Sequence, residues 1–326
     1  MSDNIERTPL IKVDHLKEYF KISGKGMLHA VDDVNFEIYE GETLGLVGES
    51  GCGKSTVGNV IMRLLQQTDG KLYLEGENVF EASKEKKNDY CRKMQMIFQD
   101  PYSSLNPRKT IRSILSEAYI VQKLCPKEEI EGKIRELCDI VGISQRLLDY
   151  YPHELDGGTR QVVGIARALS LNPKFIVCDE PVSSLDVSIQ AQVLNLLKEL
   201  QSEYGLTYLF ITHDLSVVKY FSDKIAVMYL GQLVETAEAD ELFRNTLHPY
   251  SKALLSAIPE PKAHKKMQRV KLMGELTSPI DPQVGCRFAK RCLYSCEGCT
   301  GVDPELKEYG RSHFCSCFRT EELKDV

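Results

Sequence analysis

The sequence has no long apolar segment and no excess of basic charge. Its longest stretch without Asp, Glu, Lys or Arg is Val187–Leu197, whereas a membrane-spanning helix needs roughly 20 apolar residues. The N-terminus also lacks the apolar core of a secretory signal. With 41 Lys and Arg against 47 Asp and Glu, the formal net charge is −6, so we expect no nucleic-acid partner. If the protein works at a membrane, another chain must cross it.

The composition is that of an ordinary folded protein, with 42% hydrophobic and 27% charged residues. The length of 326 residues suggests one large domain, or one domain with an appendage. The segment Ile258–Gln268 contains Pro259, Pro261 and several lysines and is interpreted as a linker. We therefore predict a main domain over residues 1–257 and a C-terminal extension over residues 258–326.

Short apolar runs alternate with helical patterns through most of the chain. Loose alternation on both sides of a Gly-containing turn predicts an antiparallel hairpin over Ile11–Phe20 and Ala30–Ile38. Further predicted strands are Thr43–Val47, Met94–Phe98, Phe175–Cys178, Leu206–Ile211 and Lys224–Tyr229. Predicted helices are Thr56–Leu65, Val187–Glu203 and an inserted helical lobe over about residues 100–169. Strands alternating with helices predict an α/β fold with a mostly parallel sheet, to which the hairpin adds an antiparallel edge.

The segment between the strand at Thr43–Val47 and the following helix matches the phosphate-binding P-loop pattern at every position. Its glycines let backbone N–H groups point at phosphate oxygens, and the helix N-terminus reinforces this attraction. Lys54 can reach the β- and γ-phosphates, and the Ser55 hydroxyl can bind Mg²⁺. The pattern predicts a P-loop NTPase whose bound nucleotide is accompanied by Mg²⁺. Its predicted nucleotide-binding residues are Gly48, Glu49, Ser50, Gly51, Cys52, Gly53, Lys54, Ser55 and Thr56.

Two carboxylates end an apolar strand further along the chain. We expect Asp179 to hold the metal, directly or through water, and Glu180 to act as the general base on the attacking water. Acids at strand ends are often solvated turn residues, so the pair alone is a weak signal. In combination with the upstream P-loop, it predicts a hydrolytic nucleotide site.

Four further motifs give the chain a family resemblance. They are Gln99 after a strand, Leu-Asp-Gly-Gly-Thr-Arg-Gln at residues 155–161, Ser-Ser-Leu-Asp at residues 183–186, and His213 after a strand. Their order and spacing resemble the ATP-binding-cassette (ABC) ATPases, specifically the subunits that energise oligopeptide and dipeptide importers. The resemblance covers about residues 11–320, and its most particular markers are residues 100–108 and the tail from His248-Pro249-Tyr250 to Cys317-Phe318.

The resemblance implies roles for individual residues. Phe20 stacks on the adenine, for which the alternative is an aromatic of the sheet core. Gln99 contacts the Mg²⁺ and senses the membrane partner. His213 bonds the γ-phosphate and couples it to Glu180. Asp186 lines the seam between two cassettes.

The resemblance also implies an assembly. Two cassettes trap two ATP molecules between them, and the partners are a paralogous ATPase, two transmembrane permease subunits and an extracytoplasmic peptide-binding protein. The subunit is expected to be peripheral, on the cytoplasmic face of the cell membrane. The same motor could instead import nickel or another metal complex or solute. A soluble, non-transport cassette ATPase is disfavoured by the single cassette and acidic balance, and a non-hydrolysing cassette by the presence of Glu180 and His213.

The signature loop departs from the family pattern Leu-Ser-Gly-Gly-Gln, with Asp156 in place of the serine and Thr159 in place of the glutamine. In the family, this loop donates hydrogen bonds to ATP held by the other subunit. Gly157 and Gly158 can still do so, but an ionised Asp cannot, and one like-charge pair at about 4 Å costs roughly 4 kcal/mol at an effective dielectric near 20. We therefore predict an asymmetric heterodimer with one impaired site. The alternative is that Asp156 is simply a good N-cap, as serine is.

Six of the eleven cysteines lie in the C-terminal extension. Without an export signal we expect no disulfides, so a late thiol cluster is better interpreted as a soft-metal site. The spacing Cys286-x5-Cys292-x6-Cys299, followed by Cys317, resembles the four-cysteine pattern in the tail of some peptide-importer cassettes. That resemblance implies a [4Fe–4S] cluster.

Two alternatives stay open for these thiols. Cys296-x2-Cys299 with Cys315-x-Cys317 is an arrangement that would suit Zn²⁺. The thiols could also be reduced and bind no metal. Cys296, Cys315 and His313 are further possible ligands in the metal-binding cases.

Overall fold

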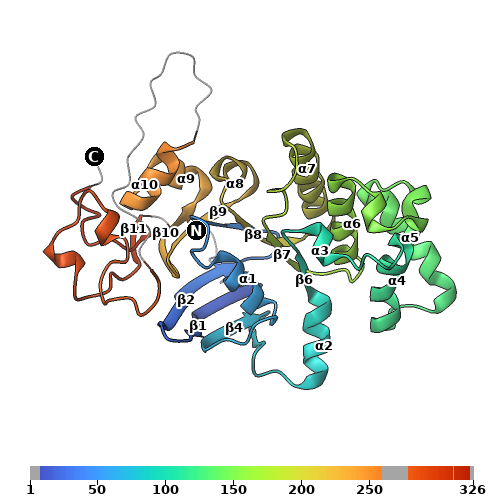
Figure 1. The fold of residues 1–326 in the computed structure, drawn as a ribbon, viewed down its shortest axis with the longest axis horizontal. Coiled ribbons are helices and arrows are strands. Elements are labelled where there is room, and N and C mark those ends of the chain that lie inside the picture. Colours follow the sequence, from blue (N-terminus) through green and yellow to red (C-terminus); the bar gives the residue numbers. More distant parts are fainter. Residues whose placement is uncertain (1–7, 259–277, 311, 324–326) are drawn as a thin grey trace, which may run out of the picture. The chain divides into compact units, whose positions relative to one another are not determined.

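The computed structural model describes residues 8–258, 278–310 and 312–323, and Figure 1 traces their fold. The chain divides into two compact units. Unit 1 comprises Met1–Tyr39, Thr43–Phe80 and Phe210–Val326, and unit 2 comprises Glu40–Glu42 and Glu81–Leu209. All but the first residue of the predicted linker Ile258–Gln268 lies outside the described residues. The predicted domain boundary after residue 257 therefore stays a prediction.

Unit 1 contains a four-stranded antiparallel sheet in the order β2-β1-β4-β5. Its strands are β1 (Ile11–Ile22), β2 (Gly26–Ile38), β4 (Asp69–Leu74) and β5 (Glu77–Asn78). The predicted hairpin of β1 and β2 is confirmed. Both strands are longer at the turn than predicted, because Gly24 and Gly26 adopt positive φ values that let the chain reverse in a short connection.

A second set of strands in unit 1 mixes parallel and antiparallel pairs. β3 (Thr43–Val47) pairs in parallel with β9 (Lys224–Tyr229), which pairs in antiparallel fashion with β10 (Gln232–Glu238). The C-terminal strands β12 (His313–Cys315) and β11 (Lys307–Gly310) continue this order beyond β10. The extension therefore packs on the rest of unit 1 instead of forming a core of its own.

The helices of unit 1 are short. They are α1 (Lys54–Ile61), α8 (Leu215–Phe221), α9 (Ala239–Arg244) and α10 (Pro249–Ser256), with 3₁₀ turns at Ala289–Arg291 and Glu297–Cys299. The predicted helix Thr56–Leu65 was wrong at both ends. It begins at Lys54 because Gly53 supplies a left-handed N-cap, and it ends before Arg63, which also has a positive φ. Strand β8 (Thr207–Thr212) runs from unit 2 into unit 1.

Unit 2 contains the predicted helical lobe. Its elements are α2 (Lys84–Lys93), β6 (Met94–Ile97), α3 (Pro101–Ser104), α4 (Ile111–Gln122), α5 (Lys127–Val141), α6 (Gly157–Leu169), β7 (Phe175–Asp179) and α7 (Val187–Tyr204), with 3₁₀ turns at Gln145–Asp149 and Pro152–Glu154. The apolar faces of α4, α5 and α6 form one buried cluster that includes Leu115, Ile134 and Val163. Strands β6 and β7 pair in parallel, as the alternation of strands and helices predicted.

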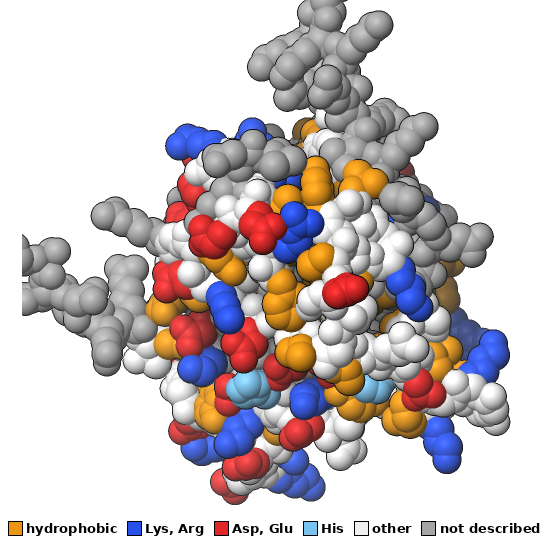
Figure 2. Space-filling model, turned by 90° about the vertical axis from the view of Figure 1, so that its left-hand side faces the viewer, with side chains coloured by type: hydrophobic (Ala, Val, Ile, Leu, Met, Phe, Trp, Pro, Cys, Tyr) orange, Lys and Arg blue, Asp and Glu red, His pale blue; other side chains and the backbone are white. Residues whose placement is uncertain are grey.

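Acidic and basic side chains are interspersed with apolar ones on the face drawn in Figure 2. This pattern fits the slightly acidic overall charge of −6. None of the helices in the described part of the chain combines the length and apolar composition that a membrane crossing requires.

Candidate functional site

Lys54 lies inside the predicted phosphate loop. The loop joins β3 to α1, and Lys54 is the first residue of α1. Its side chain is 5% exposed, and its Nζ donates to the carbonyl oxygens of Gly48 at 2.9 Å and Glu49 at 3.0 Å. The ammonium thus sits within the curve of the loop, where the phosphates of a bound nucleotide would meet a fixed positive charge and the N-terminus of α1.

Two loop glycines cannot be replaced without displacing backbone. Gly53 has a φ of 110°, and a Cβ on it would lie 2.0 Å from the carbonyl oxygen of Ala30. A Cβ on Gly48 would lie 2.2 Å from the carbonyl oxygen of Met228. The curve of the loop therefore depends on side-chain-free residues packed against β2 and β9, which is the physical reason for glycine at these motif positions.

Four more predicted residues lie in unit 1. Ser55 and Thr56 follow Lys54 on the first turn of α1 and are half-buried. Phe20 is half-buried on β1, opposite Leu28 of β2. His213 is exposed and lies directly between the end of β8 and Asp214, the N-cap of α8.

Unit 2 brings Gln99 and Glu180 together. Asp179 is the buried last residue of β7, and Glu180 follows it. The Nε2 of Gln99 donates to Oε2 of Glu180 at 2.9 Å. Glu180 has a φ of 44°, a conformation that is costly for a residue with a side chain and that clusters at functional sites. The arrangement holds a carboxylate at the end of a buried strand with one oxygen fixed by an amide.

Asp156 is the N-cap of α6. Its Oδ1 accepts from the backbone N–H of Thr159 at 2.8 Å, and its Oδ2 accepts from the Thr159 hydroxyl at 2.9 Å. The hydrogen bond from the Thr159 amide is the main cause that lowers the pKa of Asp156, so this carboxyl is ionised at neutral pH. The N-cap geometry expected of Asp156 is observed, and it places a negative charge at the start of α6.

The rest of the signature segment packs tightly within unit 2. A Cβ on Gly158 would lie 2.6 Å from Cγ2 of Ile189 on α7, whereas a Cβ on Gly157 would meet Leu185 at an ordinary 3.5 Å. Asp186 is the exposed N-cap residue of α7, and its side chain makes no capping hydrogen bond. The signature glycines and Asp186 thus belong to two helices that begin close to each other.

The four cysteines of the predicted cluster line one pocket. Cys286, Cys292, Cys299 and Cys317 share this pocket with His248, Phe288, Tyr294 and other residues of the extension. Burial raises the pKa of Cys286 to about 12 and is also the main cause that raises the pKa values of the other three thiols. They are therefore neutral at physiological pH unless a metal takes the place of the proton.

The three further possible ligands, Cys296, Cys315 and His313, do not line this pocket. Cys296 Sγ lies 3.7 Å from Cys299 Sγ, Cys315 is buried beside the Thr320 hydroxyl, and His313 Nε2 lies 2.9 Å from Glu235 Oε1. All eleven cysteines are free thiols. Among the described residues, no three His, Cys, Asp or Glu side chains are arranged to hold one metal ion.

Two residues outside the predicted site hold the second residue of the phosphate loop. The backbone N–H of Glu49 donates to the Tyr250 hydroxyl at 2.9 Å, and the Glu49 carboxylate forms an ion pair with Arg291 at 2.6 Å. Tyr250 belongs to the His-Pro-Tyr marker, and this position in a family motif was the sequence feature that could have pointed to a functional role. Nothing in the spacing around Arg291 pointed to the loop.

A buried carboxylate anchors the same region. Glu235 on β10 is fully buried and accepts from the backbone N–H groups of Leu247 at 2.7 Å and His248 at 3.0 Å. Burial lowers the pKa of His248 to about 4, and its neutral ring accepts from the backbone N–H of Tyr250 at 3.1 Å. These contacts fix the start of α10 and with it Tyr250.

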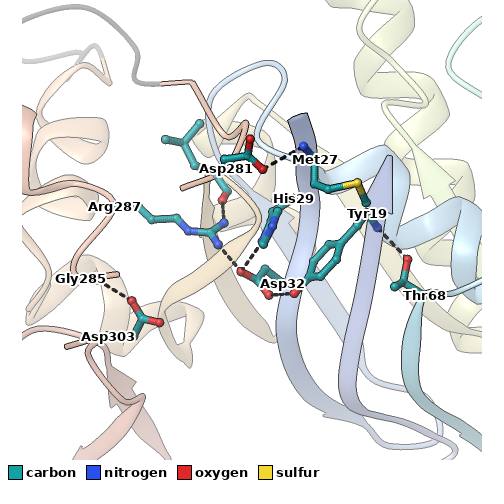
Figure 3. A network of polar contacts seen from close by, with 10 residues as sticks. Tyr19, Met27, His29, Asp32, Thr68, Asp281, Gly285, Arg287 and Asp303 are labelled. Carbon is teal, nitrogen blue, oxygen red and sulfur yellow. Dashed lines mark hydrogen bonds and ion pairs between the residues drawn. The ribbon is translucent and has the colours of Figure 1, made fainter. Parts of the chain in front are cut away.

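A polar network joins the extension to β1 and β2 (Figure 3). Asp32 accepts hydrogen bonds from the Tyr19 hydroxyl and from Arg287, and it lies 3.2 Å from His29 Nδ1. Arg287 also donates to the carbonyl oxygen of Leu230. The side chains of Arg287 and Asp32 are 7% and 15% exposed, so this ion pair is largely shielded from water.

Two family models match the chain. The model described as "ABC transporter" matches residues 31–183. The model described as "Oligopeptide/dipeptide transporter, C-terminal region" matches residues 234–299. The first match includes the phosphate loop, the signature segment and the acid pair, and the second includes three of the four pocket cysteines.

Curated relatives resemble the chain over nearly its whole length. It is 57% identical over 314 residues to the "Oligopeptide transport ATP-binding protein OppF" of Bacillus subtilis, covering 96% of this chain and 97% of that protein. It is 45% identical over 322 residues to the "Dipeptide transport ATP-binding protein DppF" of Haemophilus influenzae, covering 97% of this chain and 98% of that protein.

Solved structures match a large part of the chain. The ATP-binding cassette MJ0796, in a dimeric post-hydrolysis state bound to ADP and Pi, has a TM-score of 0.64 and 29% sequence identity. The match covers 70% of this chain and 98% of that one. CbiO1 from Clostridium perfringens, part of the ABC transporter complex cbiONQ, has a TM-score of 0.63 and 28% identity, covering 72% and 90% of the two chains.

Proposed function

The chain belongs to the ATP-binding-cassette transporter family, and from that premise we propose that it is the ATP-hydrolysing subunit of an importer of oligopeptides or dipeptides. The observation that carries this proposal is the presence, in one chain, of the nucleotide-binding region and of the C-terminal region described for oligopeptide and dipeptide transporters. The named relatives, which match along almost all of their length, support the same substrate class.

Each of the predicted site residues has its own role in ATP hydrolysis. The loop amides and Lys54 bind the triphosphate, Ser55 and Gln99 bind the Mg²⁺ that accompanies it, and Asp179 supports that metal. Glu180 takes a proton from the attacking water, and the Gln99 amide at 2.9 Å orients its carboxylate. His213 bonds the γ-phosphate, and Phe20 stacks on the adenine.

Transport follows from closure of two cassettes on shared ATP. Each phosphate loop faces the signature segment of the other cassette, so the γ-phosphate favours the closed pair and hydrolysis removes this bridge. The partners are a paralogous ATPase, two transmembrane permease subunits and, through the complex, an extracytoplasmic peptide-binding protein. This chain acts at the cytoplasmic face of the membrane as a peripheral subunit.

Peptide uptake by the reconstituted transporter tests this function. When this chain, the second ATPase, the permease and the binding protein are assembled in proteoliposomes, we expect Mg·ATP to drive uptake of a radiolabelled oligopeptide. ADP in place of ATP should give no uptake, because it lacks the γ-phosphate that closes the cassettes. ATP-driven uptake of a nickel complex, with no uptake of any peptide in a mixed library, would contradict the proposed substrate class.

We further propose that the two ATP sites of the assembly are unequal. The Asp156 carboxylate is ionised and occupies the place where the family signature offers a hydroxyl donor. Facing ATP on the partner cassette, it repels the γ-phosphate. The site built from this chain's own phosphate loop, Glu180 and His213 is the competent one, provided that the paralogue supplies an ordinary signature.

Asp156→Ser is expected to raise ATP turnover of the heterodimer up to about twofold, because it converts the impaired site into a second working site. The variant keeps the N-cap, since serine caps helices as well as aspartate does. Asp156→Asn serves as a matched control that removes the charge and also keeps the cap. Turnover is measured per heterodimer. Unchanged turnover in Asp156→Ser, together with evidence that both sites already hydrolyse ATP, would refute the asymmetry.

We also propose that the four-thiol pocket holds a [4Fe–4S] cluster with a structural role. Cys286, Cys292, Cys299 and Cys317 supply the number and type of ligands that such a cluster takes, one thiolate for each iron. A cluster needs its thiols distributed around a common space and not converging on one ion. When bound, it would cross-link segments of an extension that is otherwise rich in loops.

A further inference from the structure

Arg291 connects the cysteine-rich extension to the phosphate loop. Its Nη1 donates to Oε2 of Glu49 at 2.6 Å, and its Nη2 donates to Oε1 at 3.1 Å. The side chains of Arg291 and Glu49 are 8% and 23% exposed. The guanidinium also lies 5.9 Å from the centre of the Tyr229 ring. A two-bond arginine–carboxylate pair that is mostly removed from water is among the strong, well-oriented ion pairs.

The position of Glu49 gives this pair a consequence for ATP binding. Glu49 is a residue of the loop that binds an anion, and Lys54 donates to its carbonyl oxygen at 3.0 Å. An unpaired carboxylate at this point would repel a triphosphate, because charges in a partly buried site are poorly screened. Arg291 neutralises this carboxylate through its two hydrogen bonds. Tyr250 meanwhile holds the Glu49 amide, so the extension and α10 together fix this residue.

A second contact from the same segment supports the loop. Arg287 donates to the carbonyl oxygen of Leu230, and the N–H of the next residue, Gly231, donates to the Cys52 carbonyl oxygen at 2.8 Å. Arg287 and Arg291 both lie in the short segment 286–292. The two ends of that segment are cysteines of the pocket. The segment therefore contacts the loop directly at Glu49 and through one intermediate turn at Cys52.

We propose that Arg291 is a positioning residue for ATP binding, which acts by neutralising and holding Glu49 of the phosphate loop. The cysteine-rich extension then completes the nucleotide site of its own chain. This inference rests on the proposed ATP-binding function but adds a dependence of that site on a residue outside the cassette motifs.

A charge-removal series tests the proposal. Arg291→Ala is expected to raise the Kd for Mg·ATP about tenfold or more, because it leaves the Glu49 carboxylate unpaired in the loop. Adding Glu49→Gln to that variant removes the charge and should recover most of the affinity. Arg291→Lys keeps the positive charge but loses the two-bond geometry of the guanidinium group. Its Kd for Mg·ATP should lie between those of wild type and Arg291→Ala. Equilibrium binding of Mg·ATP to the full-length chain is measured for each variant.

The double variant separates electrostatics from misfolding. If Arg291→Ala acted only by loosening the extension, Glu49→Gln would not restore binding, and that result would overturn the proposal. Unchanged affinity in Arg291→Ala would overturn it as well. Arg244→Ala, which removes an exposed arginine from α9, is the control and should bind Mg·ATP as wild type does. A wild-type chain that binds no Mg·ATP would instead refute the proposed function itself.

Discussion

Glu180→Gln is expected to lower the rate of ATP hydrolysis about 10²- to 10⁴-fold while Mg·ATP still binds. Glutamine has nearly the same shape as glutamate but cannot take a proton from water at neutral pH. Glu180 is not part of the phosphate loop, so the substitution leaves the contacts between the loop and the triphosphate in place. Because ATP is bound but not cleaved, the variant should accumulate as a closed complex with the partner cassette. Single-turnover hydrolysis and size-exclusion chromatography with Mg·ATP measure the two effects.

The control must remove a carboxylate that is not among the predicted site residues. Glu203 is exposed near the end of α7, and Glu203→Gln should hydrolyse ATP at the wild-type rate. If Glu180→Gln also hydrolysed ATP at that rate, Glu180 would not be the general base. A loss of Mg·ATP binding in Glu180→Gln would be an equally clear contradiction, because the proposed role of Glu180 begins after binding.

The backbone of Glu180 also bears on this prediction. Its φ of 44° is costly for any residue with a Cβ, and glutamine pays the same cost as glutamate. The substitution therefore isolates the chemistry of the carboxylate from the strain of the turn. Glu180→Gly would confound the two, since glycine relieves the strain and removes the side chain together.

Local motifs predicted the strand–loop–helix around Lys54 because each part of it depends on nearby residues. A buried strand, glycines with positive φ and a helix after them are consequences of a segment of about 20 residues, although the predicted helix start at Thr56 was two residues late. The N-cap role of Asp156 could likewise be predicted, since the cap is a contact between residues three apart. The helical lobe followed from the apolar spacing in its helices.

Contacts between distant segments could not be predicted in this way. Arg291 and Glu49 are separated by 242 residues, and Arg287 and Asp32 by 255. Neither arginine belongs to a sequence motif that would distinguish it from an ordinary surface arginine. Only the fold brings each of them to its carboxylate. The sequence motifs therefore indicated the chemistry of the nucleotide site but not the contacts that join the extension to it.

Cys286→Ser is expected to abolish cluster binding in the extension. The wild-type chain, purified without oxygen, should contain about four iron atoms and show the broad visible absorption of an iron–sulfur centre. Serine is a poor ligand for the soft iron of the cluster, so the variant should lose both the iron and the colour. Because buried, protonated thiols must release protons when they bind metal, acid should also strip the cluster from wild type. Iron analysis and absorption spectra across a pH series measure these effects.

Cys91→Ser is the matched control for that experiment. Cys91 is exposed on α2 in unit 2, so its loss should leave iron content and absorption unchanged. Zinc in place of iron, or a colourless wild-type chain, would contradict the proposed cluster.

The order of the pocket is also expected to affect the phosphate loop, because Arg291 directly precedes Cys292 in the chain. If the cluster forms and the Arg291–Glu49 pair works as proposed, Cys286→Ser should weaken Mg·ATP binding too, whereas Cys91→Ser should not.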